Sequence, residues 1–316
     1  MGLVSVEDIW AAADRIDGLV VRTPLLECEQ LSRELGRQVL IKAENLQHTG
    51  SFKPRGALNA MLSWQAEGRL GEVAVSFSAG NHAAAVAYAG QRLGVRAVVA
   101  MPRDAISSKV ANVRRYGGEI VPTDDLMGTC SELAERHGCP PLYPFDLPEI
   151  IAGQGIAGLE ICADEPAPDL VIVPVGGGGL IGGIATAVKA LAPRCRVVGV
   201  ESEVSNALGA ALAAGEVVRL PGAPTIADGL AAPFAGTCTL AQAQAYVDDM
   251  VTVPEHAIAE AWPAMVAATR LLLEPSAAVG LAALRTGAIE VPEDGTVVLV
   301  ASGGNADLGK LSATPT

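Results

Sequence analysis

The sequence predicts an α/β protein with two domains, each built as a three-layer open parallel sheet with helices on both faces. Three observations lead to this prediction. Apolar runs of strand length alternate with segments of helix length along almost the whole chain. The runs are nearly continuous in hydrophobicity, as expected for strands covered on both faces. With 316 residues, half of them hydrophobic and 18% charged, the chain can bury a large core and divide into two lobes.

Six short apolar runs are predicted as buried strands because they are rich in valine, isoleucine and leucine. They cover residues 39–41, 73–77, 97–100, 170–173, 197–200 and 297–300. Helices are predicted directly after Phe52 and over residues 81–93, 105–116, 179–191 and 255–273. The Pro- and Gly-rich stretches at residues 140–148 and 221–233 are predicted as loops, and the first is a candidate domain boundary.

The composition excludes several functional classes. There are 22 basic and 35 acidic residues, a net charge of −13 and no long basic cluster, so nucleic acid is not an expected partner. Apolar stretches are interrupted before the roughly 20 residues that a membrane span needs. The amino terminus, with Glu7, Asp8 and Asp14, is too acidic for a signal peptide, and the six cysteines are scattered without metal-ligand spacing. We therefore expect a soluble, cytoplasmic protein with no membrane contact and with reduced cysteines.

Lys53 is the first candidate for chemistry. It stands at the predicted start of a helix, after a break at residues 49–51 and among the apolar residues Phe52, Ala57 and Leu58. Desolvation favours the neutral amine, which a Schiff-base nucleophile or a proton-abstracting base requires. Most lysines are solvated surface charges, so this context needs support from other segments.

Three predicted strands run directly into glycine-containing corners at residues 77–82, 175–180 and 301–305. Ligands of open α/β sheets bind beyond the carboxyl ends of the strands, so these corners are predicted to converge on one crevice. Residues 176–179, the tetraglycine turn, leave backbone N–H groups free to surround an anion at the start of a helix. This pattern predicts a phosphate site, with a glycine turn required only by packing as the alternative.

The corner at residues 78–82 also begins a predicted helix. Its free N–H groups can hold a carboxylate, while the Asn81 amide reaches a neighbouring oxygen. A plain N-cap role for Ser78 or Asn81 is the alternative. His82 is interpreted as an orienting side chain and not as an acid–base group.

The segment after residue 175 also satisfies the dinucleotide fingerprint. Gly177-x-Gly179-x-x-Gly182 has the required spacing, and Glu201 stands where a ribose-binding acid belongs. An NAD-dependent oxidoreductase is therefore an alternative for this segment taken alone. It leaves the contexts of Lys53 and of the other two corners unexplained.

Together these segments resemble the fold-type II family of pyridoxal-phosphate enzymes, with its tryptophan synthase β-like fold. The resemblance is strongest to the threonine/serine dehydratase branch, which includes serine racemase. The matching segments occur in the family's order and cover nearly the whole chain. They are residues 22–25, 44–47, 49–53, 55–57, 78–82, 176–179, 225–229, 274–276 and 302–305.

The resemblance implies that pyridoxal 5'-phosphate is the cofactor and that Lys53 binds it covalently and later removes the substrate's α-proton. It implies a discontinuous large cofactor-binding domain of residues 1–52 and 149–316, a small substrate-carboxylate domain of residues 53–148, and a homodimer. The implied cofactor contacts are Lys53, Phe52, Asn81, Gly176, Gly177, Gly178, Gly179, Leu180, Glu274 and Ser302. The implied substrate contacts are Ser51, Ser78, Ala79, Gly80, Asn81, His82, Asp228 and Gly229.

The resemblance also places Ser302 at the pyridine nitrogen. A hydroxyl there makes the ring a weaker electron sink than a carboxylate would, which favours elimination of a β-substituent. We therefore expect dehydration and deamination of a β-hydroxy amino acid, such as L-threonine or L-serine, to a 2-oxo acid and ammonia. The alternatives are a racemase or β-replacement synthase of the same fold, or a dehydratase of 3-hydroxyaspartate or of a hydroxyectoine-derived amino acid.

Two departures from the family pattern narrow these expectations. Racemases of this branch carry a serine where this chain has Ala79, so we expect little racemisation. The family's divalent-cation site pairs a glutamate at the position of Glu201 with an aspartate where this chain has Ala207, so no metal is predicted. Residues 224–233 are expected to face the substrate side chain, and they do not distinguish threonine from serine.

Overall fold

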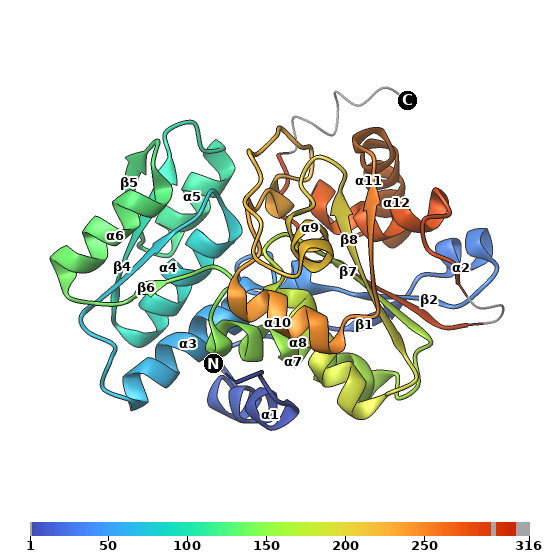
Figure 1. Ribbon diagram of the computed structural model, residues 1–316, viewed down its shortest axis with the longest axis horizontal. Helices are drawn as coiled ribbons and strands as arrows, with labels where there is room; N and C mark the ends of the chain where they lie inside the picture. The colour runs from blue at the N-terminus through green and yellow to red at the C-terminus, as the bar shows by residue number, and fades with distance from the viewer. Residues whose placement is uncertain (1, 292–294, 308–316) are drawn as a thin grey trace.

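The computed structural model describes residues 2–291 and 295–307 and contains two sheets (Figure 1). The larger sheet has the order β1-β2-β10-β7-β8-β9 and the smaller one β5-β4-β3-β6. The pairings are parallel, as predicted, apart from that between β1 and β2, which is antiparallel. The strands are β1 (Leu25–Glu27), β2 (Val39–Lys42), β3 (Val73–Phe77), β4 (Arg96–Pro102), β5 (Glu119–Thr123), β6 (Pro141–Leu142), β7 (Leu170–Pro174), β8 (Arg196–Ser202), β9 (Asp249–Val253) and β10 (Val297–Val300).

The six predicted strands are confirmed as β2, β3, β4, β7, β8 and β10. The sequence did not reveal the other four, which lie at the edges of the sheets. Edge strands are half exposed or very short, and β6 has only two residues, so they lack the continuous apolar run on which the prediction relied.

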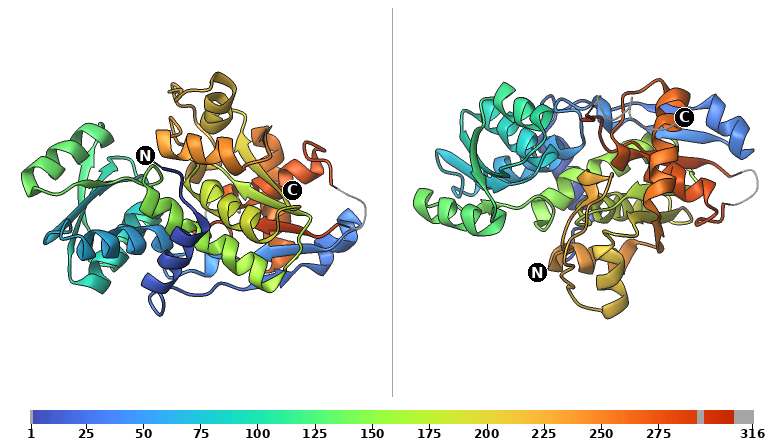
Figure 2. Two further views of the ribbon diagram at one scale, coloured as in Figure 1. Left: turned by 60° about the horizontal axis from the view of Figure 1, so that its bottom comes forward. Right: turned by 90° about the horizontal axis from the view of Figure 1, so that it is seen from above.

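Helices cover both sheets, as Figure 2 shows from two further sides. The helix predicted directly after Phe52 begins at Lys53, and the helices predicted over residues 81–93 and 179–191 have those bounds. The helices predicted over residues 105–116 and 255–273 are shorter in the structure. The second of these, α11, ends where Arg270 takes up a left-handed conformation, with φ of 61°. No helix in the described part of the chain is both long and apolar enough to cross a membrane. The helices are α1 (Val6–Arg15), α2 (Glu29–Leu35), α3 (Lys53–Ala66), α4 (Asn81–Leu93), α5 (Ser107–Arg115), α6 (Leu126–His137), α7 (Pro148–Asp164), α8 (Gly179–Leu191), α9 (Ala207–Ala214), α10 (Thr237–Tyr246), α11 (Glu255–Thr269) and α12 (Val279–Arg285), with 3-10 turns η1 (Glu44–Leu46), η2 (Asp228–Leu230) and η3 (Pro275–Ala278).

Helix α7 supports both α3 and α8. A Cβ at Gly153 would lie 2.4 Å from the carbonyl oxygen of Arg55 in α3. A Cβ at Gly183 of α8 would lie 2.4 Å from the carbonyl oxygen of Ile151. Glycine at these crossings lets the backbones approach closely, so α7 fixes the start of α3, which carries Lys53, relative to the start of α8.

A buried ionic network joins α3 to β2 and α7. Arg55, which is fully buried, donates to Glu44 at 2.9 Å and to Glu160 at 2.8 Å, and Lys42 donates to Glu160 at 2.5 Å. Arg55 and Glu44 belong to segments that carried the family resemblance, and their positions give them a structural role. Buried charges require such pairing, because each would otherwise lose its hydration without compensation.

The strands of the smaller sheet lie between residues 73 and 142, and those of the larger sheet lie between residues 25 and 42 and between residues 170 and 300. The division of the chain into two domains, with boundaries after residues 52 and 148, stays a prediction.

Candidate active site

A cavity of about 530 Å³ is lined by residues that follow β3 in the smaller sheet and β7 and β10 in the larger one. The three predicted corners therefore converge on one site. Of the residues predicted for the cofactor and the substrate, only Ser51 is absent from the lining. Ser51 is fully buried, and its backbone pairs with that of Gly303.

Lys53 is the first residue of α3, and Pro54 in the first turn fits a helix start because it has no N–H to leave unpaired. The Lys53 Nζ donates to the Pro144 carbonyl oxygen at 2.9 Å and lies 4.9 Å from the centroid of the Phe52 ring. Burial lowers the pKa of Lys53 to about 8, and the negative charge of Glu274 opposes this shift. An appreciable neutral fraction of the amine is therefore available near neutral pH.

The tetraglycine turn joins β7 to α8. Gly178 has a φ of 89°, a left-handed conformation that glycine adopts without strain. A Cβ at Gly177 would lie 2.2 Å from the Phe145 ring, and one at Gly179 would lie 2.6 Å from Gln154 Oε1. Packing alone therefore requires glycine at residues 177 and 179, whether or not a ligand binds. The turn also leaves the N–H groups of the first turn of α8 without partners inside the helix, as an anion site requires.

The Asn81 amide, at the start of α4, is held from two sides. Its Nδ2 donates to Glu274 Oε1 at 2.7 Å, and its Oδ1 accepts from Asn305 Nδ2 at 2.9 Å. Asn305 Nδ2 also donates to the carbonyl oxygen of Thr49 at 2.8 Å. Asn305 was not predicted as a site residue, although it ends the third glycine-containing corner. Asn305 therefore connects the corner at residues 301–305 to the corner at residues 78–82 and to the segment that leads into Lys53.

Glu274 is buried, and one of its carboxyl oxygens, Oε2, has no hydrogen-bond partner. Burial is the main cause that raises the pKa of Glu274, and Asp228 adds to it, while Lys109, Asn81 and Lys53 act in the opposite direction. An unpaired buried carboxyl oxygen is unfavourable unless a ligand supplies a donor.

His82 lines the same cavity as Lys53. Its Nε2 lies 3.2 Å from the Leu142 carbonyl oxygen, to which it donates, and its Nδ1 has no partner. Burial, followed by the positive charge of Lys53, lowers the pKa of His82 to about 3. His82 is therefore neutral at physiological pH, which fits an orienting role better than proton transfer.

Lys109 of α5 was missed by the sequence analysis. Its Nζ pairs with Asp228 Oδ2 at 2.6 Å, and its stem crosses Gly80, where a Cβ would lie 2.5 Å from Lys109 Cδ. The Gly80 N–H donates to Ser78 Oγ at 3.0 Å, so one of the amides predicted to hold a carboxylate is already engaged. The linear sequence gives no sign that Lys109 lies beside Asp228, because only folding brings these two residues together.

Pyridoxal phosphate fits this cavity in three respects. The tetraglycine turn presents the N-terminus of α8 to a phosphate, with no side chains in the way. Lys53 offers an amine with a lowered pKa to an aldehyde. The unpaired oxygen of Glu274 and the Ser302 hydroxyl remain for polar groups of the ring or of a substrate.

Comparison with known proteins decides the family. Residues 16–303 match the family model described as pyridoxal-phosphate dependent enzyme. The chain belongs to this family. Among similar proteins, an L-threonine ammonia-lyase of Thermotoga maritima is 39% identical over 98% of this chain and 77% of its own length. An L-threo-3-hydroxyaspartate ammonia-lyase of a Pseudomonas species is 37% identical over 99% of both chains. The solved structure of maize serine racemase has a TM-score of 0.93 and 35% identity over 99% of this chain and 97% of its own.

Glu201, which the dinucleotide alternative requires, has another role in this pyridoxal-phosphate dependent enzyme. Its carboxylate accepts from the N–H groups of Leu208 at 2.8 Å and Gly209 at 2.9 Å, at the start of α9. Burial raises the pKa of Glu201 to about 7 in spite of these bonds. Over the ranges that the structure describes, no group of three or more His, Cys, Asp and Glu side chains is arranged to hold a metal ion.

Proposed function

We propose that the protein catalyses the α,β-elimination of a β-hydroxy amino acid such as L-threonine or L-serine, with release of a 2-oxo acid and ammonia. One observation carries the proposal: the Lys53 amine, with a pKa of about 8, lines the cavity that also contains the tetraglycine turn and Ser302. The activity of the Thermotoga relative, an L-threonine ammonia-lyase, supports the same reaction class.

Each part of the site has a distinct task in this proposal. Bound pyridoxal phosphate supplies the sink for the electrons of the substrate's α C–H bond. The Lys53 Nζ accepts the α-proton, because its lowered pKa leaves part of the amine neutral at working pH. The N-terminal amides of α4 bind the substrate carboxylate with help from the helix dipole. The Ser302 hydroxyl lines the cavity and, if it faces the ring nitrogen as the resemblance implies, would not stabilise a pyridinium as an acid does. The ring would then be a weaker electron sink, which favours loss of the β-hydroxyl.

A racemase is the second candidate, because maize serine racemase has a closely similar fold. Ala79 argues against it, since a methyl group cannot deliver a proton to the face of the substrate opposite Lys53. The Pseudomonas relative suggests 3-hydroxyaspartate as a further substrate of the proposed elimination. We also propose the predicted domain boundaries, a homodimer and a cytoplasmic location. The buried thiols of Cys28, Cys130, Cys162 and Cys195, which form no disulfide, support that location.

The test uses purified holoenzyme supplied with L-threonine and L-serine. Release of 2-oxobutanoate and pyruvate, each with one equivalent of ammonia, is expected, and Lys53→Ala abolishes both. Borohydride treatment followed by peptide mass spectrometry should locate the cofactor on Lys53. Interconversion of D- and L-serine at a rate near that of 2-oxo acid release would instead support the racemase.

A further inference from the structure

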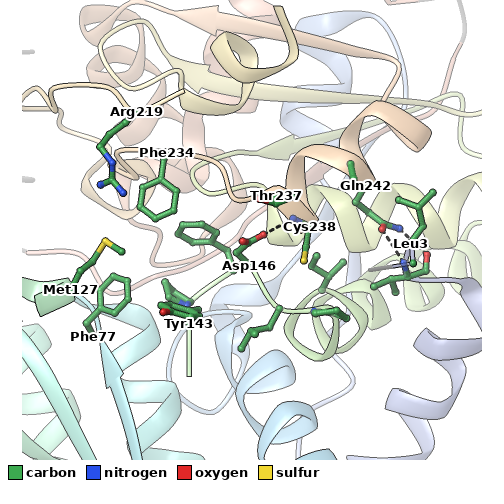
Figure 3. Close-up of a pocket in the computed structure, with 18 residues that line it drawn as sticks. Leu3, Phe77, Met127, Tyr143, Asp146, Arg219, Phe234, Thr237, Cys238 and Gln242 are labelled. Atoms are coloured by element: carbon green, nitrogen blue, oxygen red, sulfur yellow. Dashed lines mark hydrogen bonds between the residues drawn. The ribbon is translucent and has the colours of Figure 1, made fainter. Parts of the chain in front are cut away.

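A second cavity, of about 730 Å³, adjoins the candidate active site (Figure 3). Its other walls come from the amino-terminal residues 2–4, the loop at residues 143–148 and helix α10. Pro144, whose carbonyl oxygen accepts from Lys53 Nζ at 2.9 Å, lines both cavities. The residues that line both cavities are Phe77, Met127, Pro144, Phe145, Arg219 and Phe234.

Aromatic side chains are concentrated around this junction. The chain contains four phenylalanines, and each of them lines at least one of the two cavities. Phe145 and Phe234 meet edge to face with their centroids 5.6 Å apart, and Phe77 meets Tyr143 in the same manner at 6.0 Å. A chain with only 3% aromatic residues thus surrounds this space with aryl groups, which suit an apolar or aryl guest.

Arg219 provides a positive charge at the same junction. Its guanidinium carbon lies 4.5 Å from the centroid of the Phe234 ring, and the two residues form an isolated backbone bridge that fixes their relation. Figure 3 shows both side chains extending toward Met127 and Phe77. Within the described part of the chain, no carboxylate forms an ion pair with Arg219.

The other charged groups of the two cavities already have partners or tasks. Lys109 pairs with Asp228, and Lys53 is assigned to the cofactor. Asp146 accepts from the backbone N–H of Cys238 at 2.8 Å. Asp124 pairs with Arg103 at 3.1 Å, and Asp125 accepts from the N–H of Gly128 at 2.9 Å. Arg219 is the basic group at this junction that a ligand's anion can use.

We propose that the junction with the second cavity receives the distal part of the substrate's side chain and that Arg219, which lines this junction, binds a carboxylate at the end of that side chain. The substrate class is then a β-hydroxy amino acid whose side chain continues through an apolar or aryl segment to an acid. This inference rests on the proposed elimination. Threonine carries only a methyl group beyond its β-carbon and would leave the cavity unused.

The first test measures binding to the holoenzyme without turnover. L-4-Carboxyphenylalanine and L-phenylalanine lack the β-hydroxyl, so their affinities can be compared by calorimetry. Because charge-assisted hydrogen bonds to a guanidinium are strong, the carboxylated ligand should bind about tenfold more tightly. Arg219→Met should reduce this ratio to about one, Arg219→Lys should retain part of it, and the matched surface change Arg33→Met on α2 should leave it intact.

The second test measures kcat/KM for 3-(4-carboxyphenyl)serine against 3-phenylserine and threonine. A preference for the carboxylated substrate that is lost in Arg219→Met supports the inference. Equal kcat/KM values for the two aryl substrates in the unaltered enzyme, or equal affinities in the binding test, would overturn it while threonine is still consumed. Failure to release a 2-oxo acid from any substrate would instead remove the proposed elimination, and the binding ratio would still report on Arg219.

Discussion

The Asn81 amide donates to Glu274 Oε1 across 2.7 Å, and this bond joins the start of α4 to the residue that precedes η3. The bond links the smaller sheet's lobe to the larger one at the candidate site, and it leaves Glu274 Oε2 unpaired near the Lys53 amine. The negative charge of Glu274 therefore acts on Lys53, whose amine the proposed elimination requires.

Glu274→Gln should lower the pKa of Lys53 below its value of about 8, because the Glu274 charge raises it. Lowering the pKa of a basic group increases its neutral fraction at pH 7. Capture of pyridoxal phosphate by the apoenzyme should therefore accelerate by about twofold at that pH. Stopped-flow absorbance, recorded from about pH 6 to about pH 10, gives the capture rate as a function of pH. The midpoint of this curve should move to lower pH.

Glu274→Asp is the control for this change, since it keeps the negative charge and should keep the midpoint closer to that of the unaltered protein. A midpoint that stays in place or moves to higher pH in Glu274→Gln would show that the carboxyl group does not act on Lys53.

Arg55→Met should destabilise the fold by about 3–5 kcal/mol, the usual cost of leaving buried charges without their partner. The change would leave the buried Glu44 carboxylate without its ion-pair partner and would leave Glu160 with Lys42 alone. Urea unfolding of the apoenzyme measures the free energy. Arg33→Met removes an exposed pair with Glu29 and should cost less than about 1 kcal/mol. Similar losses of unfolding free energy in both variants would mean that burial does not determine how much the Arg55 network stabilises the fold.

The sequence predicted the elements whose signal is local and missed those whose role depends on tertiary contacts. Strands such as β7 are buried on both faces, so their apolar runs are sufficient evidence. The glycine-containing corners followed from the same strands, because chain direction fixes which end of a parallel strand meets the crevice. Arg55 and Lys109 look like ordinary surface residues in the sequence, and only folding brings them to Glu160 and Asp228. One usable signal was overlooked: Lys42 and Glu160 interrupt otherwise apolar segments, which indicates buried pairing.

Ala79→Ser should introduce measurable racemisation of serine. Ala79 lines the cavity beside Ser78, at the turn that precedes α4, and a hydroxyl there adds a group able to give and take a proton. Chiral chromatography of L-serine incubations should detect D-serine in the variant and little in the unaltered enzyme. Ala79→Val adds bulk without a hydroxyl and serves as the control. D-serine formation by Ala79→Val equal to that by Ala79→Ser would assign the effect to crowding.

Gly177→Ala should weaken cofactor binding and lower the melting temperature, because its methyl group would lie 2.2 Å from the Phe145 ring. Either the ring or the tetraglycine turn must move, and overpacking of this kind costs about 1–3 kcal/mol. Gly71→Ala is the control, since a Cβ there meets nothing within 4 Å. The double variant with Phe145→Leu separates the two possible causes. If ring contact is the problem, the smaller side chain should restore much of the melting temperature and of the affinity for pyridoxal phosphate. If affinity stays low while the melting temperature recovers, the methyl group obstructs the phosphate itself, and the turn serves the cofactor directly.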